Sequence, residues 1–211
     1  MSTLGKFITF EGGEGAGKST QCTLLASHLK DKGIDVLVTR EPGGTPSAEM
    51  IRKLLVEGDI NRWQSSTEAL LMFAARSEHW HTRIHPALQK GTWVISDRFV
   101  DSSYAYQGYA RGIPLEQLEK LYQFAVGSVY PDLTFFLNIP LNQGFERVRN
   151  RVTSYEERFE KEALSFHEKV QNGFLDLAKK FKERYIVEDA TRSIHVIAQS
   201  LQNEIHRRFS I

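Results

Sequence analysis

The chain has 211 residues, of which 41% are hydrophobic and 25% are charged, and its 27 basic and 26 acidic residues leave a formal net charge of +1. This length is typical of one domain, and the composition excludes a mainly disordered chain. The balanced charge gives no indication of nucleic acid or a membrane as an electrostatic partner, and no signal peptide or membrane span is recognisable. The one cysteine, Cys22, leaves no intrachain disulfide. We therefore expect a single domain over residues 1–211 in the reducing cytoplasm, without a nucleic-acid or membrane partner.

Apolar β-type runs alternate along the chain with segments whose apolar residues recur at helical spacing. In chain order the pattern predicts a strand at 7–10, a helix at 18–32, a strand at 34–39, helices at 46–56 and 66–89, a strand at 92–97, a helix at 115–126, a strand at 133–138, a helix at 141–182 interrupted near 152–154, a strand at 185–187 and a helix at 194–207. Pro86 is expected to kink or shorten the helix at 66–89. Strands separated by helices imply crossover connections, so we expect an α/β three-layer sandwich with a five-stranded parallel sheet and helices on both faces.

A glycine-rich motif lies between the first strand and the first helix. Gly12, Gly17, Lys18 and Ser19 match the pattern G-x-x-x-x-G-K-[ST]. The glycines let the backbone curl so that several amide groups point at phosphate oxygens, and the following helix directs its positive end at the same anion. Lys18 is expected to reach the β- and γ-phosphates of ATP. The expected ATP-binding residues of this P-loop are Gly12, Gly13, Glu14, Gly15, Ala16, Gly17, Lys18, Ser19 and Thr20.

Two carboxylates lie at the ends of predicted strands. Asp97 closes an apolar strand, and Glu11 directly precedes the P-loop. In an open α/β sheet, ligands bind at the carboxyl edge of the strands. We expect Ser19 and Asp97 to hold Mg²⁺, although a strand-ending aspartate is as often only a cap.

Arginines are concentrated in segments that follow the strands. The sequence has Arg40, Arg52, Arg76 and Arg98, and then Arg147, Arg149, Arg151 and Arg158. A donor phosphate and an acceptor phosphate held in line need many cations, and planar guanidinium groups suit bidentate phosphate contacts. No Asn-Lys-x-Asp motif for guanine recognition is present, and the short chain leaves no room for the extra domains of most motor ATPases. These observations favour a small-molecule kinase.

Several motifs occur in the order and at the spacing of a known family. They are the P-loop, Thr39-Arg40-Glu41-Pro42-Gly43-Gly44-Thr45, Phe73-Ala74-Ala75-Arg76, Asp97-Arg98, and Ser102-Ser103-Tyr104-Ala105-Tyr106-Gln107-Gly108. With them the chain resembles the bacterial thymidylate kinases from Phe7 to Arg207. The resemblance implies the P-loop NTPase fold with a mobile lid near residues 147–160, and conversion of dTMP and ATP to dTDP and ADP. It also implies a homodimer that packs through the helices near 47–57 and 66–90.

The resemblance assigns roles in the acceptor site. Arg98 would bind the dTMP phosphate with Arg40 or Glu41 nearby, and Arg76 would hydrogen-bond the thymine edge. Arg52 corresponds to a further arginine near the acceptor phosphate. The implied dTMP-binding residues are Glu11, Arg40, Glu41, Pro42, Arg52, Met72, Phe73, Arg76, Arg98, Ser102, Ser103 and Gln107.

The resemblance also assigns roles near the transferred phosphoryl group and the adenine. Glu11 and Asp97 would orient the acceptor phosphate, the 3′-hydroxyl and the metal. The backbone around Asp189 and Ala190 would lie against adenine and complete the ATP site. The expected catalytic residues are Glu11, Lys18, Arg98, Arg149 and Arg151.

The chain departs from the family pattern at two places. An aromatic residue often precedes the thymine-binding arginine by four positions, but here Met72 holds that position and Phe73 follows it. Both positions lie close to one helical face, so either side chain could cover the base. In the lid, the usual hinge glycine is missing, and residues 13–16 of the P-loop contain no arginine. We therefore expect the lid to supply the charge-stabilising arginine, as Arg149 or Arg151, when it closes over ATP.

Parts of the sequence are compatible with two other functions and with one other kind of site. A deoxynucleoside kinase or a kinase for another nucleoside monophosphate would share the P-loop, with Glu11 as a base for a nucleoside hydroxyl; the third class is a nucleotide-binding regulator without catalysis. The arginines of the acceptor site and the lid favour the dTMP kinase. His79, His81 and His85 do not share one helical face, so we expect a solvated or subunit-facing helix there instead of a zinc site.

Overall fold

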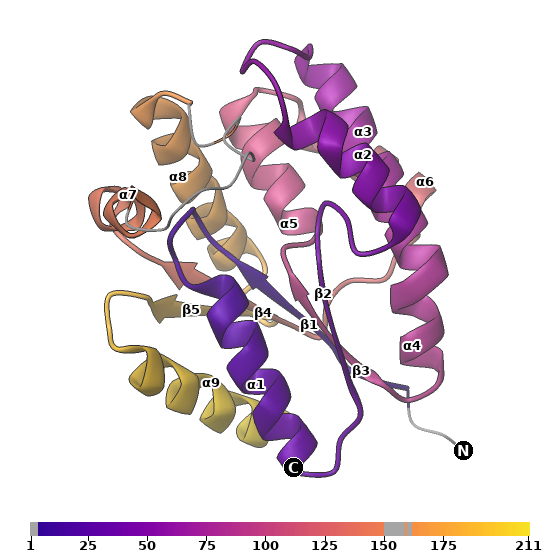
Figure 1. Cartoon of the computed structure of the whole chain (residues 1–211), viewed down its shortest axis with the longest axis vertical. Coiled ribbons are helices and arrows are strands. Elements are labelled where there is room, and N and C mark those ends of the chain that lie inside the picture. The colour runs from indigo at the N-terminus through magenta and orange to yellow at the C-terminus, as the bar shows by residue number, and fades with distance from the viewer. Residues whose placement is uncertain (1–3, 150–158, 160–161) are drawn as a thin grey trace.

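The computed structural model describes residues 4–149, 159 and 162–211, and its centre is a five-stranded parallel sheet (Figure 1). Its strands are β1 (Phe7–Glu11), β2 (Val36–Arg40), β3 (Trp93–Asp97), β4 (Leu133–Asn138) and β5 (Tyr185–Asp189). The order across the sheet is β2-β3-β1-β4-β5. The first strand, β1, therefore lies in the middle, with β3 and β2 on one side and β4 and β5 on the other. The predicted parallel sheet is confirmed, and the predicted strand ends differ from the observed ones by two residues or fewer.

Helices cover both faces of the sheet, which confirms the predicted three-layer sandwich (Figure 1). One face carries α1 (Lys18–Asp31) and α9 (Ile194–Phe209). The other face carries α3 (Ser65–His79), η1 (Trp80–Ile84), α4 (His85–Gln89), α5 (Val100–Ser103), η2 (Tyr104–Ala110), α6 (Leu115–Ala125) and α8 (Leu164–Lys180). Two further helices are α2 (Pro46–Val56), which packs on α3, and α7 (Leu141–Arg149), which follows β4.

Side chains along the central strands point alternately to the two faces of the sheet, and each face has its own hydrophobic core. In β1, Phe7 packs into the core under α3 and α6, whereas Ile8 and Phe10 pack into the core under α1 and α9. In β4, Phe136 and Phe135 divide between the same two cores. A central strand buried on both faces requires such a nearly continuous apolar run. Each fully buried side chain of this size contributes roughly 1.5–3 kcal/mol, so the middle of the sheet is a rigid base for the loops at its carboxyl edge.

The helical segment after β3 was not predicted from the sequence. Residues 100–103 form α5 and residues 104–110 form η2, a run of wide π-helical turns. Tyr104, Tyr106 and Gln107 are all buried, so this segment is enclosed on several sides and lacks the polar stripe of a surface helix. Wide π-helical turns frequently occur at functional sites.

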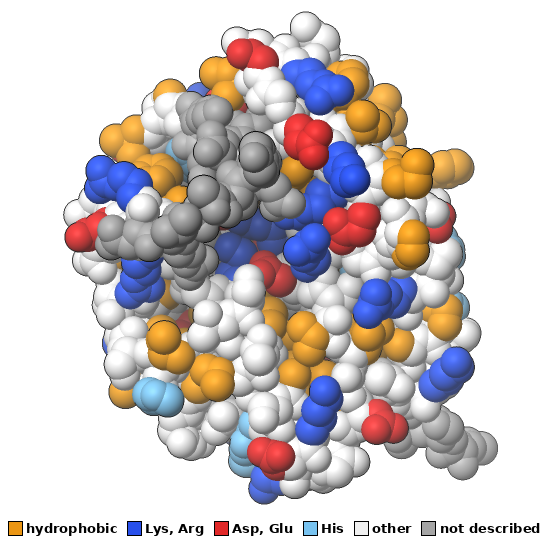
Figure 2. All heavy atoms as spheres, viewed as in Figure 1, with side chains coloured by type: hydrophobic (Ala, Val, Ile, Leu, Met, Phe, Trp, Pro, Cys, Tyr) orange, Lys and Arg blue, Asp and Glu red, His pale blue; other side chains and the backbone are white. Residues whose placement is uncertain are grey.

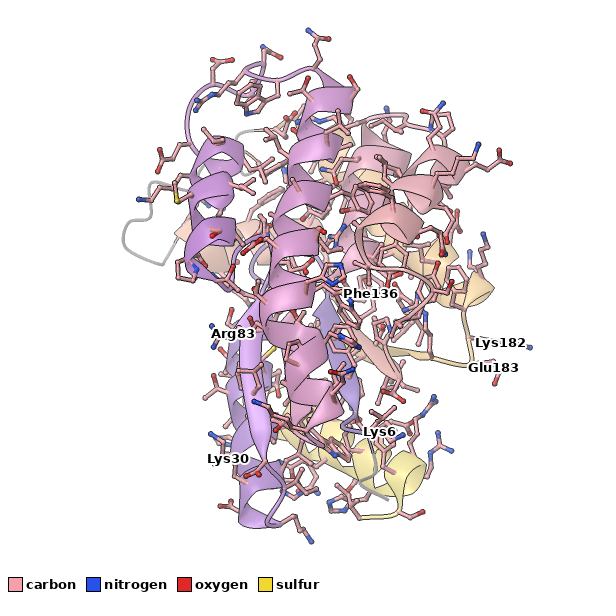
Figure 3. All side chains as sticks on the ribbon, turned by 90° about the vertical axis from the view of Figure 1, so that its right-hand side faces the viewer. Lys6, Lys30, Arg83, Phe136, Lys182 and Glu183 are labelled. Atoms are coloured by element: carbon pink, nitrogen blue, oxygen red, sulfur yellow. The ribbon has the colours of Figure 1, made fainter. Side chains whose placement is uncertain are left out.

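The helix predicted at 66–89 is observed as three consecutive pieces, α3, η1 and α4. Figure 3 shows them as one long helix with α2 beside its upper part. Pro86 lies in the first turn of α4 and does not end the helix; the wide turns of η1 directly precede it. This arrangement fits the loss of a hydrogen bond one turn before a proline.

Within the helix predicted at 141–182, the structure describes α7 and α8. Most of the segment between α7 and α8 lies outside the described residues, including the predicted interruption at 152–154. Within the part of the chain that the structure describes, no helix combines the length and apolar character needed to cross a bilayer.

Candidate active site

A cavity of about 560 Å³ opens at the carboxyl ends of β1, β2 and β3. Figure 2 looks onto this side of the molecule, where Lys and Arg side chains gather in a hollow. The cavity brings together these predicted acceptor-site residues: Arg40, Glu41, Pro42, Arg52, Met72, Arg76, Arg98, Ser102, Ser103 and Gln107. From the P-loop, it is lined by Glu14, Gly15, Gly17, Lys18, Ser19 and Thr20. One concave space therefore joins the two groups of residues that the sequence suggested for the two nucleotides.

The P-loop has the backbone conformation that its glycines permit. Gly12 and Gly15 have φ angles of +142° and +72°, and a Cβ atom on Gly15 would lie 2.2 Å from the carbonyl oxygen of Gly144. Only glycine fits such a close backbone approach. Lys18 begins α1 and donates hydrogen bonds to the carbonyl oxygens of Gly12 at 3.1 Å and Gly13 at 2.9 Å. Its ammonium group is thus held over the loop, where a phosphate could replace the carbonyl oxygens as its partner.

Ser19 and Asp97 are in direct contact. The Ser19 hydroxyl, in the first turn of α1, donates a 2.6 Å hydrogen bond to Oδ2 of Asp97 at the end of β3. Mg²⁺ prefers hydroxyl, carboxylate and phosphate oxygens over nitrogen or sulfur. An oxygen pair of this kind beside a phosphate-binding loop fits that ion.

Arg98 bridges the P-loop and the end of β3. It has a φ angle of +71°, unusual for a residue with a side chain and the kind of backbone strain found at functional sites. Its guanidinium donates to the carbonyl oxygen of Gly12 at 2.9 Å and to Oε1 of Glu14 at 2.6 Å, and it lies over the ring of Tyr106. Burial raises the pKa of Glu14, but Arg98 and Lys18 outweigh this effect and lower it to about 2. Both groups are therefore charged at neutral pH.

Glu11 lies beneath the cavity and not in its lining. It is fully buried, and its carboxyl oxygens accept hydrogen bonds from the Phe99 amide at 2.8 Å and the Ser102 hydroxyl at 2.6 Å. Burial and the nearby carboxylate of Asp101 raise the pKa of Glu11 to about 8. The structure thus gives Glu11 contacts that position a cavity-lining serine; the direct contact with substrate or metal expected from the sequence stays a prediction.

Arg76 is held rigidly in the cavity wall. It is 3% exposed and donates to Oε2 of Glu41 at 2.8 Å, to the Ser103 hydroxyl at 2.9 Å and to the Phe99 carbonyl at 3.1 Å. The ring of Phe73 packs under its guanidinium, 4.8 Å away. A charged group fixed by this many partners loses little conformational entropy when a ligand binds to it.

The structure distinguishes Met72 from Phe73, whose spacing in the sequence left open which of them faces the cavity. Met72 lines the cavity, whereas Phe73 is buried in the core beneath Arg76. Of the two side chains, Met72 is therefore the one that a ligand in the cavity could contact, and Phe73 packs against Arg76 on the core side.

His79 contradicts the expectation of a solvated or subunit-facing helix. It is fully buried, and its ring bonds to Thr39 Oγ1 at 2.6 Å and to Glu41 Oε1 at 3.1 Å. His81 is exposed and bonds to the Ala125 carbonyl, and His85 stacks on Trp80. The side of α3 that carries His79 faces the β2–α2 loop, which the helical spacing of the three histidines does not reveal. Sequence reasoning missed His79 as a group that holds Glu41 and, through it, Arg76.

Two of the arginines predicted near the lid, Arg147 and Arg149, lie in α7. Arg147 of α7 donates to the Ala190 carbonyl at 3.0 Å and to the Gly15 carbonyl at 3.5 Å, which connects the predicted adenine loop to the P-loop. Asp189 accepts from the backbone and hydroxyl of Thr191 and so shapes that loop. Arg149 ends α7 and is exposed. Arg151, the other predicted lid arginine, lies outside the described residues.

Two arginines predicted for the acceptor site connect α2 to the β2–α2 loop and to the end of β2. Arg52 donates a 2.6 Å hydrogen bond to the Pro42 carbonyl, and Arg40 pairs with Glu49 at 3.1 Å. The peptide bond between Glu41 and Pro42 is cis. The loop and the end of β2 are thus each tied to α2 beside the cavity.

Comparison with known proteins gives one consistent result. The family model described as thymidylate kinase matches residues 10–201. Curated thymidylate kinases of Alkalilimnicola ehrlichii and Caulobacter vibrioides are 46% and 43% identical to this chain; the alignments cover 96% and 99% of it, and 93% and 100% of the relatives. A crystal structure of thymidylate kinase from Ehrlichia chaffeensis superposes with a TM-score of 0.77 at 34% identity, covering 96% of this chain and 99% of that one. The fold is therefore that of the P-loop NTPases.

Proposed function

The chain belongs to the thymidylate kinase family, and on this premise we propose that its cavity transfers the γ-phosphoryl group of ATP to dTMP, giving ADP and dTDP. One observation carries the proposal: Arg98 of the acceptor side contacts the Gly12 carbonyl, the same oxygen that Lys18 of the donor side contacts. A phosphate bound to each cation would lie next to the other. Phosphoryl transfer requires such an arrangement of donor and acceptor in line.

On the donor side, the P-loop amides and Lys18 bind the ATP phosphates. Lys18 is buried at 7% exposure, so exchange of the Gly12 and Gly13 carbonyls for phosphate oxygens makes its charge act in a weakly screened environment. Ser19 and Asp97 are the oxygen ligands that would hold Mg²⁺, which neutralises phosphate charge when bound. The loop at Asp189 and Ala190 is the proposed adenine contact, because Arg147 ties it to the P-loop.

On the acceptor side, Arg98 binds the dTMP phosphate with Arg40 and Arg52 nearby, and thymine lies against Arg76 and Met72. Arg76 is fixed by its protein partners before substrate arrives. Orienting the base in this cavity therefore costs little conformational entropy of the protein. With the base at Arg76, the phosphate of dTMP lies at the P-loop end of the cavity.

The chemical step needs positioning and charge more than it needs a base. An oxygen of the dTMP phosphate is already anionic at neutral pH; it forms a bond to the γ-phosphorus while the bond from that phosphorus to the bridging oxygen of ADP breaks. Lys18 and Arg98 stabilise the charge that spreads over the transferred group. Because residues 13–16 of the P-loop contain no arginine, we assign a further charge-stabilising arginine to the lid, as Arg149 or Arg151.

The same proposal includes a homodimer in the cytoplasm. An interface on α2, α3 and α6 is supported by exposed apolar side chains on these helices, namely Met50, Leu54, Leu70 and Phe124. The most exposed of the four is Phe124, at 92%. An exposed apolar group of this kind is typical of a protein–protein interface.

A coupled assay of ATP consumption tests the reaction, with dTMP, dUMP, thymidine, dCMP and GMP each offered as the acceptor. We expect turnover with dTMP to exceed turnover with thymidine, dCMP and GMP. Turnover of thymidine without turnover of dTMP would show that the acceptor is a nucleoside and overturn the proposal.

A further inference from the structure

Gln107 in the cavity wall has a carboxylate as its hydrogen-bond partner. Gln107 belongs to η2, is 1% exposed and lines the cavity. Its Nε2 donates a 3.0 Å hydrogen bond to Oε1 of Glu68, a fully buried residue in the first turn of α3. Glu68 is not among the residues that line the cavity. The carboxylate thus contacts Gln107 from behind.

This contact decides which end of the Gln107 amide faces the ligand. An ionised carboxylate only accepts hydrogen bonds, so only the NH₂ end of an amide can face it, and a flipped amide would set two acceptors against each other. The amide oxygen of Gln107 must then point away from Glu68. Within the part of the chain that the structure describes, no group donates a hydrogen bond to that oxygen. It is available to a ligand in the cavity.

Glu68 also pairs with a half-buried arginine. Arg111 donates to both oxygens of Glu68, at 3.4 Å and 3.3 Å, and to Glu162 at 2.5 Å, and it lies over the ring of Phe166. Both oxygens of Glu68 thus accept hydrogen bonds, Oε1 from Gln107 and Arg111 and Oε2 from Arg111. The NH₂ end of the Gln107 amide is the end that matches this accepting carboxylate.

The cavity wall therefore presents hydrogen-bond donors and an acceptor as separate, fixed groups: the N–H groups of Arg76 and the oxygen of Gln107. Thymine and uracil carry an N3–H donor beside the acceptor O4. Cytosine carries the reverse pattern, an N3 acceptor beside an amino donor at position 4. A base with N3–H finds an acceptor at Gln107 and donors at Arg76, whereas cytosine faces one mismatch at each.

We propose that Glu68 is a positioning residue that fixes the amide of Gln107 with its oxygen toward the cavity and thereby selects pyrimidines with an N3–H group over cytosine. This inference rests on the proposed function, because it assigns the base of the acceptor nucleotide to the Arg76 end of the cavity. Glu68 itself does not touch the substrate. Its effect is to prevent an amide rotation that would otherwise accommodate either base.

The test compares kcat/KM for dTMP and dCMP at saturating ATP in the wild type, Glu68→Gln and the control Glu78→Gln, which changes a partly exposed glutamate on the same helix. Glutamine at position 68 can donate or accept, so the Gln107 amide becomes free to rotate. We expect the dTMP-to-dCMP ratio to fall about tenfold or more, mainly through a higher KM for dTMP, as when a buried polar partner is left unmatched. Glu78→Gln should keep the wild-type ratio.

Two outcomes overturn the inference while leaving the proposed function intact. One is a folded Glu68→Gln enzyme whose dTMP-to-dCMP ratio stays within about twofold of the wild type. The other is an unchanged ratio in Gln107→Leu, which lacks the amide and decides the question even if Glu68→Gln does not fold. Failure of the wild type to phosphorylate dTMP at all would instead overturn the proposed function, and the inference with it.

Discussion

The guanidinium of Arg98 lies 2.6 Å from the carboxylate of Glu14, so the cation that we propose for the acceptor phosphate is paired with an acid of the P-loop. The pair joins the end of β3 to the loop before α1 and is partly buried, with side-chain exposures of 14% and 26%. An incoming phosphate and Glu14 therefore compete for the same cation. The pair also makes the stability of the fold sensitive to acid.

Glu14→Gln is expected to destabilise the protein at neutral pH but not in strong acid. The pKa of Glu14 is lowered from about 4.5 to about 2 in the folded chain, so its ionised form stabilises the fold above about pH 4.5, and this contribution is lost as the pH falls through 2. Denaturant unfolding of the wild type and the variant at several pH values measures the difference. It should shrink steadily below pH 4.5, whereas the exposed control Glu57→Gln should show little difference at any pH. A gap that does not change with pH would contradict the assignment.

Glu11→Gln is expected to behave in the opposite sense. The pKa of Glu11 is raised from about 4.5 to about 8, so the stability that its protonated form contributes is complete below about pH 4.5 and is lost as the pH rises through 8. Glutamine stays neutral and can still accept from the Phe99 amide and bond to Ser102. The variant should therefore gain stability relative to the wild type between pH 5 and 8, and the gain should level off above that range. Equal slopes of unfolding free energy against pH in the two proteins would refute the raised pKa of Glu11 as the cause.

His79→Ala is expected to weaken dTMP binding without touching the substrate. The buried ring bonds to Glu41, which in turn bonds to Arg76, so its loss leaves a buried carboxylate short of a partner and Arg76 less well fixed. We expect KM for dTMP to rise about tenfold while kcat changes by less than about threefold, in the range of a lost hydrogen bond to a charged group. His81→Ala, an exposed change two residues further along the chain, is the control. A wild-type KM in His79→Ala would mean that Arg76 is held by its other partners alone.

Asp97→Asn tests the proposed Mg²⁺ ligands. The amide oxygen could still accept the Ser19 hydroxyl bond, but the side chain loses the negative charge that favours a divalent cation. The Mg²⁺ concentration for half-maximal activity should rise about tenfold, and chelation of Mg²⁺ should abolish activity in both proteins. Asp31→Asn, at the exposed end of α1, should leave the Mg²⁺ dependence unchanged. An unchanged dependence in Asp97→Asn would remove this residue from the metal site.

The sequence predicted elements with strong periodicity and missed those whose environment comes from distant contacts. α2 and β4 were predicted with their observed bounds, because a proline and an apolar run mark them locally. η2 was missed because its tyrosines are enclosed on several sides and show no helical stripe. Periodicity describes one buried face, and it fails where tertiary packing surrounds a segment.

The candidate site shows the same division. The P-loop was identified from local chemistry, since its glycines and lysine act within eight residues. The contact between Glu68 and Gln107 joins residues 39 apart, and that between Thr39 and His79 joins residues 40 apart; neither follows from spacing along one element. Likewise, helical spacing placed Met72 and Phe73 near one face, but it was the packing of Phe73 against Arg76 that left Met72 to the cavity. Residues that support a site from behind are specified by the fold, and the sequence pattern alone does not reveal them.

The lid arginine is tested by Arg149→Ala and Arg151→Ala, each measured for kcat and for KM of ATP. The P-loop offers Lys18 but no arginine, so on the proposed ATP side the charge of the transition state has no guanidinium partner unless α7 or the segment after it provides one. Removing that partner should lower kcat by roughly three to five orders of magnitude, the usual effect of an arginine finger, with a smaller change in KM for ATP. Arg147→Ala is a different case, because Arg147 contacts the Gly15 and Ala190 carbonyls; it should raise KM for ATP more than it lowers kcat. Lys179→Ala, a 78% exposed cation on α8, controls for loss of positive charge alone. If Arg149→Ala and Arg151→Ala both keep kcat within about threefold of the wild type, the lid supplies no catalytic arginine, and Lys18 and Arg98 must stabilise the transferred group without it.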